Sequence, residues 1–426
     1  MSTLSPRGDE LAQGPLFRSL LTTMATDTYS ATANPTGFIN MGAAENYIMF
    51  PEMASFTASH PLQMTVDDFS YNDGPWGTRR LRSAMAQHIN RRFHPVHPVS
   101  ERDLLLANGV TAVCDMLGFS LAEPGDGILM GQPLYQAFVP DFGTKAKVKP
   151  VLVPFGDDVD QFSPAAVACY EQALKRAREE DGTNVCALLL CHPHNPLGQC
   201  YPRETIIEIM RLCAKYKIHL LSDEIYAMSV FEVPDPHAVP FESVLAFDSS
   251  EYIDPDYLHV MYGMSKDFAA GGLRIGCLYT RNEALWKAFS VMNQFNWPGI
   301  ADQLVACEIL EDDAWLDEFF QTSRQRLGER NALTRELLGS KNIEYHTDAN
   351  AGFFVWADFR PYLSMTGKEG WEAEEELMKR FIDAKVLVTN GKMLNAEEPG
   401  FWRIIFSHEE RVVREGFRRI FEVLGV

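Results

Sequence analysis

Residues 264–276 read MSKDFAAGGLRIG and follow an apolar run over 258–262. Lys266 therefore lies in a glycine-rich turn after a predicted strand, and Arg274 follows eight residues later. A lysine amine can form an imine with an aldehyde, and an arginine guanidinium can hold a phosphate with its planar fork of donors. The role of Lys266 depends on the partners that the rest of the chain supplies.

The composition is that of a globular protein with two or three domains. The 426 residues are 46% hydrophobic and 23% charged, and the net charge is -20. Such a charge disfavours binding to nucleic acid or to an anionic membrane, because phosphates would be repelled. We see neither a signal peptide nor an apolar run of the roughly 18 residues that a membrane span needs, and we expect a cytoplasmic protein.

The eight cysteines show no CxxC pairs and no regular spacing. Cys186, Cys191, Cys213 and Cys277 lie in apolar runs, which predicts buried free thiols in a reducing compartment. We expect no metal site.

Seven short apolar runs predict strands, at 104–107, 128–130, 151–153, 185–191, 218–222, 258–262 and 275–279. Several are continuous, as in strands that are buried on both faces. Helical patterns intervene, notably at 111–121, 162–179 and 203–215. This alternation predicts an α/β fold with a large domain, in which helices flank a mostly parallel seven-stranded sheet.

The segments outside this pattern predict a smaller α+β domain. We expect helices in this domain at 370–384 and 409–423, with strands at 352–356 and 402–406. Two further helices are expected before it, one at 78–93 and a long or broken one at 303–338. Residues 1–59 are then an N-terminal arm and part of the small domain. Residues 60–315 form the large domain, and residues 316–426 form the C-terminal small domain.

Chemically useful residues follow several predicted strands, at the sheet edge where ligands bind in such folds. Val110 and Thr111 open a helix, whose free N–H groups can hold a phosphate or simply belong to a tight connection. Tyr135 can stack on a flat ligand or pack in a loop. Asn195 lies in the rigid turn HPHNPLG at 192–198, where two histidines without a third ligand disfavour a metal.

A carboxylate, Asp223, ends the run at 218–222, and Tyr226 follows three residues later. A buried carboxylate is costly unless it has a charged or donor partner. We therefore expect Asp223 to face a ligand, with Tyr226 directed into the same crevice.

Together, Asn195, Asp223, Tyr226, the pair Ser265 and Lys266, and Arg274 resemble the pyridoxal-phosphate enzymes of fold type I, in the class I/II aminotransferase family. Their order and spacing fit, with 28 residues from Asn195 to Asp223. The segments MGAAEN at 41–46, YGMSKDF at 262–268 and FWRI at 401–404 resemble the 1-aminocyclopropane-1-carboxylate synthases and their synthase-like relatives in animals and fungi.

The resemblance implies that the large domain binds pyridoxal 5'-phosphate. Lys266 would bond to the cofactor and move the proton at the substrate Cα. Asp223 would pair with the ring nitrogen, and Asn195 and Tyr226 would bond the ring oxygen. The implied catalytic residues are thus Lys266, Asp223 and Tyr226.

Further cofactor contacts follow from the same resemblance. Tyr135 would stack on the ring, and the phosphate would be held by Arg274, Ser265, Val110 and Thr111. Tyr71 is the candidate for a tyrosine that reaches the cofactor across a dimer interface.

The substrate would be bound by three residues. Arg403 would take the α-carboxylate, Glu45 would lie near the substrate amine and side chain, and Asn195 would also face the substrate. Two positions depart from the family pattern. Gly263 replaces a frequent phosphate-binding serine, and His192 replaces a frequent asparagine that shapes the turn.

The implied function is a pyridoxal-phosphate enzyme that acts on a small amino-acid substrate as a homodimer with shared active sites. Its reaction would be an elimination or cyclisation at the β or γ carbon, as in the synthases, or carbon–sulfur lysis in fungal secondary metabolism. The alternative is an aminotransferase that exchanges amino and keto acids. A non-catalytic cofactor-binding protein is a third reading.

Overall fold

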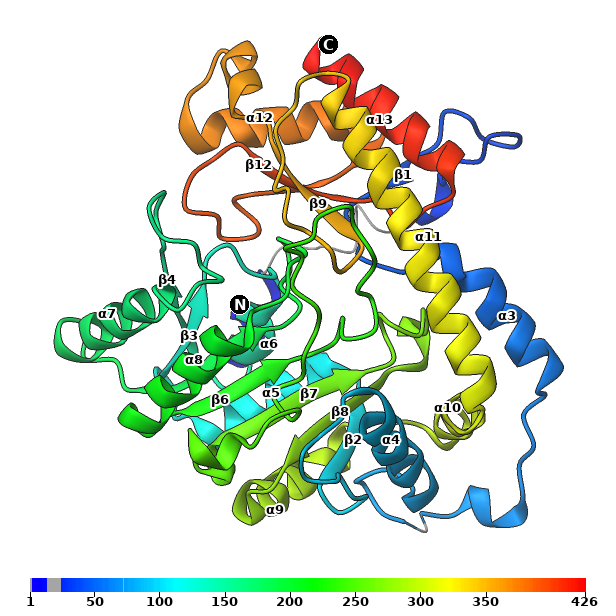
Figure 1. Ribbon diagram of the computed structural model, residues 1–426, viewed down its shortest axis with the longest axis vertical. Coiled ribbons are helices and arrows are strands. Elements are labelled where there is room, and N and C mark those ends of the chain that lie inside the picture. The colour runs from blue at the N-terminus through cyan, green and yellow to red at the C-terminus, as the bar shows by residue number, and fades with distance from the viewer. Residues whose placement is uncertain (1, 14–23, 72) are drawn as a thin grey trace.

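The large sheet holds all seven predicted strands. The computed structural model describes residues 2–13, 24–71 and 73–426. The sheet order is β2-β8-β7-β6-β5-β3-β4, and β8 runs opposite to the other six strands of this sheet. The strands are β2 (Leu104–Asn108), β3 (Gly127–Gly131), β4 (Lys149–Val153), β5 (Val185–Cys191), β6 (His219–Asp223), β7 (Leu258–Gly263) and β8 (Ile275–Thr280). The expected mostly parallel sheet is confirmed (Figure 1).

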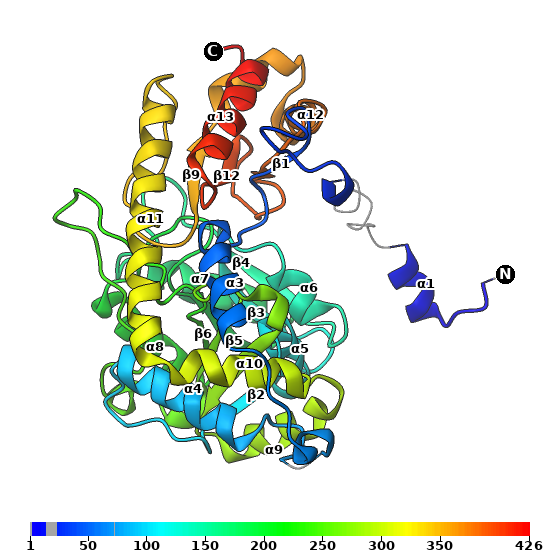
Figure 2. The same ribbon diagram turned by 90° about the vertical axis from the view of Figure 1, so that its right-hand side faces the viewer.

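Helices cover both faces of this sheet, because its strands are apolar on both sides. In β2, Leu104 and Leu106 pack in one buried cluster, and Leu105 and Ala107 pack in another. The first face carries α4 (Arg79–Arg92), α7 (Ala166–Glu179), α8 (Arg203–Tyr216) and α10 (Ile300–Glu311), and the second carries α5 (Val110–Leu121), α6 (Phe138–Gly143) and α9 (Glu283–Met292). Figure 2 shows α7 and α8 on one side of the sheet and α5 and α6 on the other.

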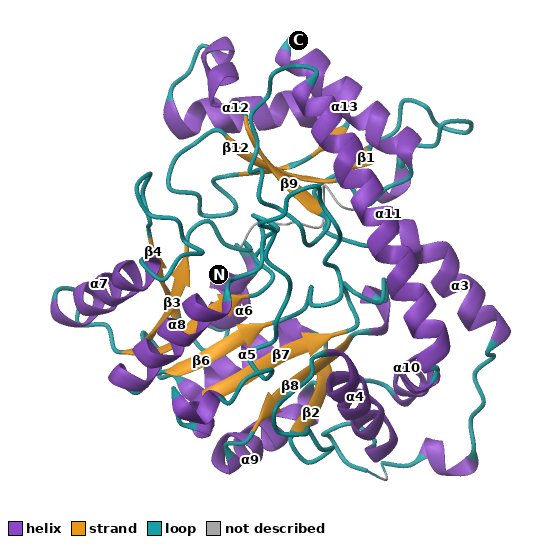
Figure 3. Ribbon diagram, in the orientation of Figure 1, coloured by secondary structure: helices purple, strands orange, loops and turns teal. Residues whose placement is uncertain are grey.

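The small domain is built from both ends of the chain. Its antiparallel sheet contains β9 (Phe354–Asp358), β11 (Thr389–Asn390) and β12 (Phe401–Ile405), and α12 (Gly370–Asp383) and α13 (Glu410–Leu424) pack beside it (Figure 3). Strand β1 (Ile39–Asn40) pairs in parallel with β10 (Val386–Leu387). This pairing places the N-terminal segment beside the C-terminal part of the chain.

The helix predicted at 303–338 is two helices, α10 and α11 (Asp313–Gly339). Asp312 separates them, because its side chain accepts a hydrogen bond from the Trp315 N–H and caps α11. In Figure 1, α11 runs from the large sheet up to the small domain. The predicted domain boundaries after residues 59 and 315 stay predictions; the second falls inside the first turn of α11.

The remaining helical segments are short. They are α1 (Pro6–Ala12), α3 (Phe50–Ser59) and the 3₁₀ turns at Tyr47–Met49, Val66–Phe69, Ser249–Glu251, Pro255–Tyr257, Gly271–Leu273, Asn293–Phe295 and Arg360–Thr366. Among the helices that the structure describes, none combines the length and apolar character that a bilayer crossing needs.

Candidate active site

A cavity of about 190 Å³ lies at the carboxyl ends of the parallel strands. Segments that follow β2, β3, β5, β6 and β7 all line this cavity. In open α/β sheets, ligands bind just beyond this carboxyl edge of the strands. It brings together ten of the predicted residues: Glu45, Val110, Thr111, Tyr135, Asn195, Asp223, Tyr226, Ser265, Lys266 and Arg274. Arg403 contacts this group from the small domain, whereas Tyr71 lies elsewhere.

The side chain of Lys266 lines the cavity, and a hydrogen bond fixes its amine. Lys266 follows β7, is partly buried, and donates a hydrogen bond from Nζ to the Ala44 carbonyl at 2.6 Å. Burial first, and then the charge of Arg403, lowers the pKa of Lys266 to about 8, while Glu45 and Asp223 oppose the shift. About a tenth of the amine is therefore neutral at pH 7, far more than for an ordinary lysine, and the neutral form is the nucleophile or base.

The turn that carries Lys266 is fixed from behind by Asp267. The Asp267 carboxylate accepts hydrogen bonds from the Met228 N–H at 2.9 Å, the Ser229 hydroxyl at 2.6 Å and the Tyr262 hydroxyl at 3.0 Å. These bonds join the lysine turn to β7 and to the segment after β6, so that the amine is positioned by a rigid frame.

Asp223 ends β6 as a buried carboxylate with few partners. Only 4% of the residue is exposed, and the one hydrogen bond that its carboxylate accepts from the described residues is a long one, 3.3 Å, from the Ile225 N–H. Burial raises the pKa of Asp223 to about 7, and Lys266 opposes the rise. The neighbouring Glu224 is equally buried but satisfied, with donors from Ser222, Ser243 and Val244. Asp223 thus lacks the donor that a ligand would supply.

Arg403 is a buried cation without a counterion. It is 1% exposed, and no carboxylate in the described ranges pairs with it. Its Nη1 donates to Asn195 Oδ1 at 2.9 Å, its Nη2 donates to the Gly42 carbonyl at 2.8 Å and more weakly to Thr389, and its buried Nε has no partner there. Burial lowers the pKa of Arg403. Because an uncompensated buried charge is costly, this arrangement is suited to an anionic ligand.

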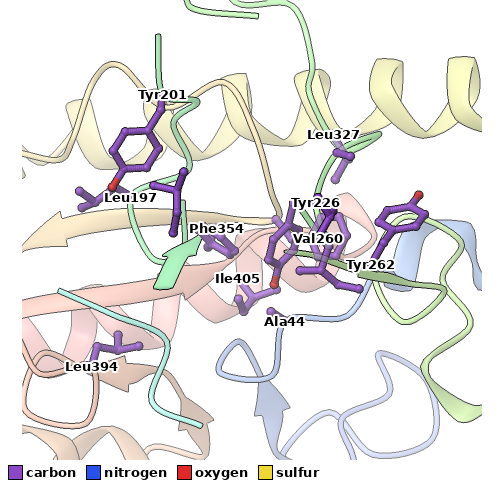
Figure 4. Packing of buried hydrophobic residues seen from close by; sticks show 14 of the residues in the cluster. Ala44, Leu197, Tyr201, Tyr226, Val260, Tyr262, Leu327, Phe354, Leu394 and Ile405 are labelled. Atoms are coloured by element: carbon purple, nitrogen blue, oxygen red, sulfur yellow. The ribbon is translucent and has the colours of Figure 1, made fainter. Parts of the chain in front are cut away.

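The hydroxyl of Tyr226 is also buried without a partner among the described residues. Its ring meets Phe353 and Phe354 edge-on at 5.3 and 5.5 Å. Figure 4 shows Tyr226 between Phe354 and Val260, with its hydroxyl directed toward Ala44. Burial raises the pKa of Tyr226, so the group is a neutral donor that lacks an acceptor.

The opposite side of the cavity forms a cradle for an anion. Gly109 caps α5 with a φ of 82°, and the Val110 and Thr111 N–H groups donate no hydrogen bond within the described chain. A side chain at Gly109 would collide with the Arg274 guanidinium. Arg274 is therefore packed against a helix N-terminus, and both favour a phosphate group.

Both departures from the family pattern have a local reason. A Cβ at position 263 would lie 2.6 Å from the Ile275 carbonyl oxygen, so a serine has no room there. The His192 ring accepts the Tyr201 N–H at 3.1 Å, and its Nε2 lies 3.0 Å from the Glu242 carbonyl oxygen. This position shapes the turn, as predicted.

Two predicted residues are open to solvent. Tyr71 is 84% exposed and stacks on Trp297 with ring centroids 5.9 Å apart, outside the cavity of its own chain. Glu45 is exposed at the cavity, next to Ala44. Cys186, which the sequence predicted to be buried, is only partly buried.

The cavity has lining residues that the sequence did not reveal. They are Cys114, Phe138, Asp141, Cys191, Ile225 and Gly271. Asp141 reaches the cavity from α6, where no motif marks it. In the part of the chain that the structure describes, no group of three or more His, Cys, Asp or Glu side chains could hold a metal ion.

Comparison with known proteins gives matches along nearly the whole chain. A family model described as aminotransferase class I and II matches residues 63–420. The 1-aminocyclopropane-1-carboxylate synthase-like protein 1 of Takifugu rubripes is 31% identical over 432 residues, which cover 99% of this chain and 67% of that protein. A probable aminotransferase, aclI, of Aspergillus oryzae is 32% identical over 393 residues, 91% of each chain.

Solved structures show the same fold. An aspartate aminotransferase double mutant of Thermus thermophilus matches with a TM-score of 0.75 and 21% identity, over 99% of this chain and 100% of that chain. At this identity the likeness concerns the fold alone.

Proposed function

Since the chain belongs to the class I and II aminotransferase family and is a pyridoxal-phosphate-dependent enzyme, we propose that it eliminates or cyclises at the β or γ carbon of an amino-acid substrate. The observation that carries this proposal is Glu45. Its carboxylate lines the cavity directly after Ala44, whose carbonyl accepts a hydrogen bond from Lys266. It can therefore act on the substrate amine or side chain beside the base, and the resembled synthases have a glutamate here.

The residues present fit the cofactor. Asp223 is a buried carboxylate that lacks a cation, Tyr226 is a buried hydroxyl that lacks an acceptor, and Arg274 and the N-terminus of α5 form an anion cradle. Pyridoxal phosphate, when bound, supplies an aldehyde that captures the substrate amine and a ring that accepts the electrons of a broken Cα bond.

We assign the following roles to the chain. Arg403 binds the substrate α-carboxylate and orients Cα toward Lys266, whose neutral Nζ takes the Cα proton. Asp223 holds the proton on the ring nitrogen. Asn195 and Tyr226 donate to the ring oxygen, since Asn195 Oδ1 is already occupied by Arg403 and its amide N–H groups remain for the ligand.

The other residues hold the cofactor in place. Tyr135 covers the ring face, and burial raises its pKa to about 12, so its hydroxyl stays neutral. Arg274, Ser265 and the N–H groups of Val110 and Thr111 bind the phosphate.

An aminotransferase is the second candidate, because a relative named as a probable aminotransferase matches 91% of each chain. Incubation of the holoenzyme with cysteine conjugates and common amino acids separates the two. We expect release of a thiol, ammonia and a keto acid without any added keto acid. Cofactor converted to its amine form, and restored only by an added keto acid, would overturn the proposal in favour of transamination.

Glu45→Gln is expected to lower this elimination rate by about 10- to 100-fold, because it removes one charge-assisted contact to the substrate. The loading of the protein with cofactor, measured by absorbance, should stay unchanged, because Glu45 lies outside the predicted cofactor contacts. A matched exposed carboxylate, Glu283 on α9, serves as the control in Glu283→Gln. An E45Q enzyme with wild-type elimination would contradict the role of Glu45.

We also propose a homodimer with shared active sites. Val66, Phe69, Tyr71 and Phe295 are 80–90% exposed, and the stacking of Tyr71 on Trp297 joins their two segments into one apolar surface. Such a surface is typical of a protein contact. Tyr71 would cross this contact to the phosphate of the partner subunit.

Mixing two inactive variants tests this exchange. We expect Lys266→Ala and Tyr71→Ala homodimers to have little activity, and their re-equilibrated mixture to recover roughly a quarter of wild-type activity. Half of the dimers in the mixture then pair an intact Lys266 with an intact Tyr71 in one site. A mixture no more active than the sum of its parts would contradict sharing of the site.

We also propose that the protein is located in the cytoplasm. All eight cysteines are free thiols, six of them buried, which supports a reducing compartment.

A further inference from the structure

Asp141 places a carboxyl group at the phosphate end of the cavity. It lies on α6, which packs against α5, and it lines the same cavity as Val110, Thr111 and Arg274. Thr111 belongs to the first turn of α5, whose N–H groups form the cradle. The roles described above leave Asp141 without a function.

An ionised carboxylate in this position would oppose a phosphate dianion. Like charges that share a buried site cannot both stay ionised without a large cost, and one of them gains a proton. A protonated carboxyl group instead becomes a donor, as the cradle requires.

We propose that Asp141 is a proton-dependent ligand of the cofactor phosphate. On binding, its carboxyl group takes up one proton from solvent and donates the O–H to a phosphate oxygen. The inference deepens the proposed function and rests on the placement of the phosphate between Arg274 and α5.

The surroundings of Asp141 favour this protonation. Burial raises the pKa of Asp141 to about 6; Asp115 adds to the rise, and Thr111 and Arg274 oppose it. Asp115 belongs to α5 and is itself paired with Lys145 at 2.7 Å. A bound phosphate adds negative charge and raises the pKa of Asp141 further.

The groups on the other side of Asp141 supply no cation. Tyr135 and Cys114 stay neutral, because burial raises the pKa of both. Asp223 is a carboxyl group as well, and the charge of Asp141 raises its pKa. Arg274 is therefore the one cation among the described groups that act on Asp141, and the phosphate competes for it.

The consequence is a pH-dependent affinity. Since the bound state holds the proton more tightly than the free state, binding weakens as the pH rises through the pKa of free Asp141. In Asp141→Asn the amide donates at every pH, so the proton is no longer needed. The ratio of the wild-type Kd to the D141N Kd should rise with pH.

The test uses pyridoxamine 5'-phosphate, which lacks the aldehyde and cannot bond to Lys266. Calorimetric titration of the cofactor-free protein from pH 5.5 to 8.5 gives the Kd ratio, in which the titrations of the ligand and of Lys266 cancel. We expect a ratio near one at pH 5.5 and at least about tenfold by pH 8. Asp141→Leu, which has no donor, should bind more weakly than D141N at every pH.

Three controls separate the possible failures. Glu283→Gln, which changes an exposed carboxylate on α9 outside the cavity, should keep the wild-type pH dependence, and pyridoxamine without phosphate should give a flat ratio. Arg274→Ala should weaken binding of the phosphorylated ligand; if it does not, the phosphate placement and the inference both fail. A flat ratio with the Arg274 effect intact overturns the role of Asp141 alone. Circular dichroism at each pH confirms that the compared proteins are folded.

Discussion

Lys266→Ala is expected to lower turnover by at least about a thousandfold, because it removes the group that takes the Cα proton. The cofactor should still bind, since Asp223, Arg274 and the N-terminus of α5 are untouched. A stopped assay measures the loss of turnover. The absorbance of the dialysed protein measures how much cofactor it still binds. Added methylamine should restore part of the rate, because the deleted side chain leaves room for a small amine beside Ala44.

Lys287→Ala is the matched control. Lys287 lies exposed on α9, where its partner is Glu283 at 3.5 Å. This variant should keep wild-type turnover and stability. A Lys266→Ala enzyme within about tenfold of the wild-type rate, or one that methylamine leaves unchanged, would show that another group moves the proton.

Asp223→Asn is expected to affect activity and stability in opposite directions. Turnover should fall by at least about a hundredfold, because an amide cannot hold the proton on the ring nitrogen. The cofactor-free protein, in contrast, should become more stable at pH 8. The buried carboxylate has only the long bond from the Ile225 N–H, and its replacement by a neutral amide removes a desolvation cost.

The stability gain should depend on pH. The folded-state pKa of Asp223, about 7, lies well above the ordinary value of 3.8 for an aspartate, so the folded protein holds this proton more tightly. Asp223 therefore lowers the free energy of unfolding as the pH rises from 3.8 to about 7, by up to about 4 kcal/mol above that range. Denaturant unfolding of wild type and D223N should differ little at pH 4 and most at pH 8.

Glu224→Gln is the control, because Glu224 is equally buried and its pKa is also raised to about 7. Its carboxylate accepts bonds from two hydroxyls and the Val244 N–H, and a glutamine would turn an amide donor toward these donors. E224Q should therefore stabilise the cofactor-free protein less than D223N does at pH 8, because it loses these bonds. Destabilisation by D223N would show that Asp223 has a structural partner.

The sheet could be predicted from the sequence because its strands are buried on both faces and appear as uninterrupted apolar runs. The strand order and the antiparallel direction of β8 could not, since β8 is as completely buried as β7, which runs the other way. The short helix α9 was not predicted from the sequence. The strand predicted at 352–356 begins two residues later, because Gly352 has a φ of 74° and makes a turn there.

Those residues of the candidate site that belong to a sequence motif could be predicted. Lys266, Asp223 and Asn195 follow strands in the order of the family pattern, and the cavity contains all three. Asp141 could not be found, because a single acid between the apolar residues of α6 resembles any surface position of an amphipathic helix. The hydrogen bonds of Lys266 and Arg403 to the Ala44 and Gly42 carbonyls could not be predicted either, because every residue has a backbone carbonyl whatever its side chain.

Reduction of the cofactor-loaded enzyme with borohydride, followed by peptide mass spectrometry, tests the central claim most directly. The reagent fixes the cofactor to the lysine that carries it. We expect the added pyridoxyl mass on the peptide that contains Lys266, and its absence from the peptide that contains the control residue Lys287. A modified lysine other than Lys266, or no modified lysine in a loaded protein, would contradict the account.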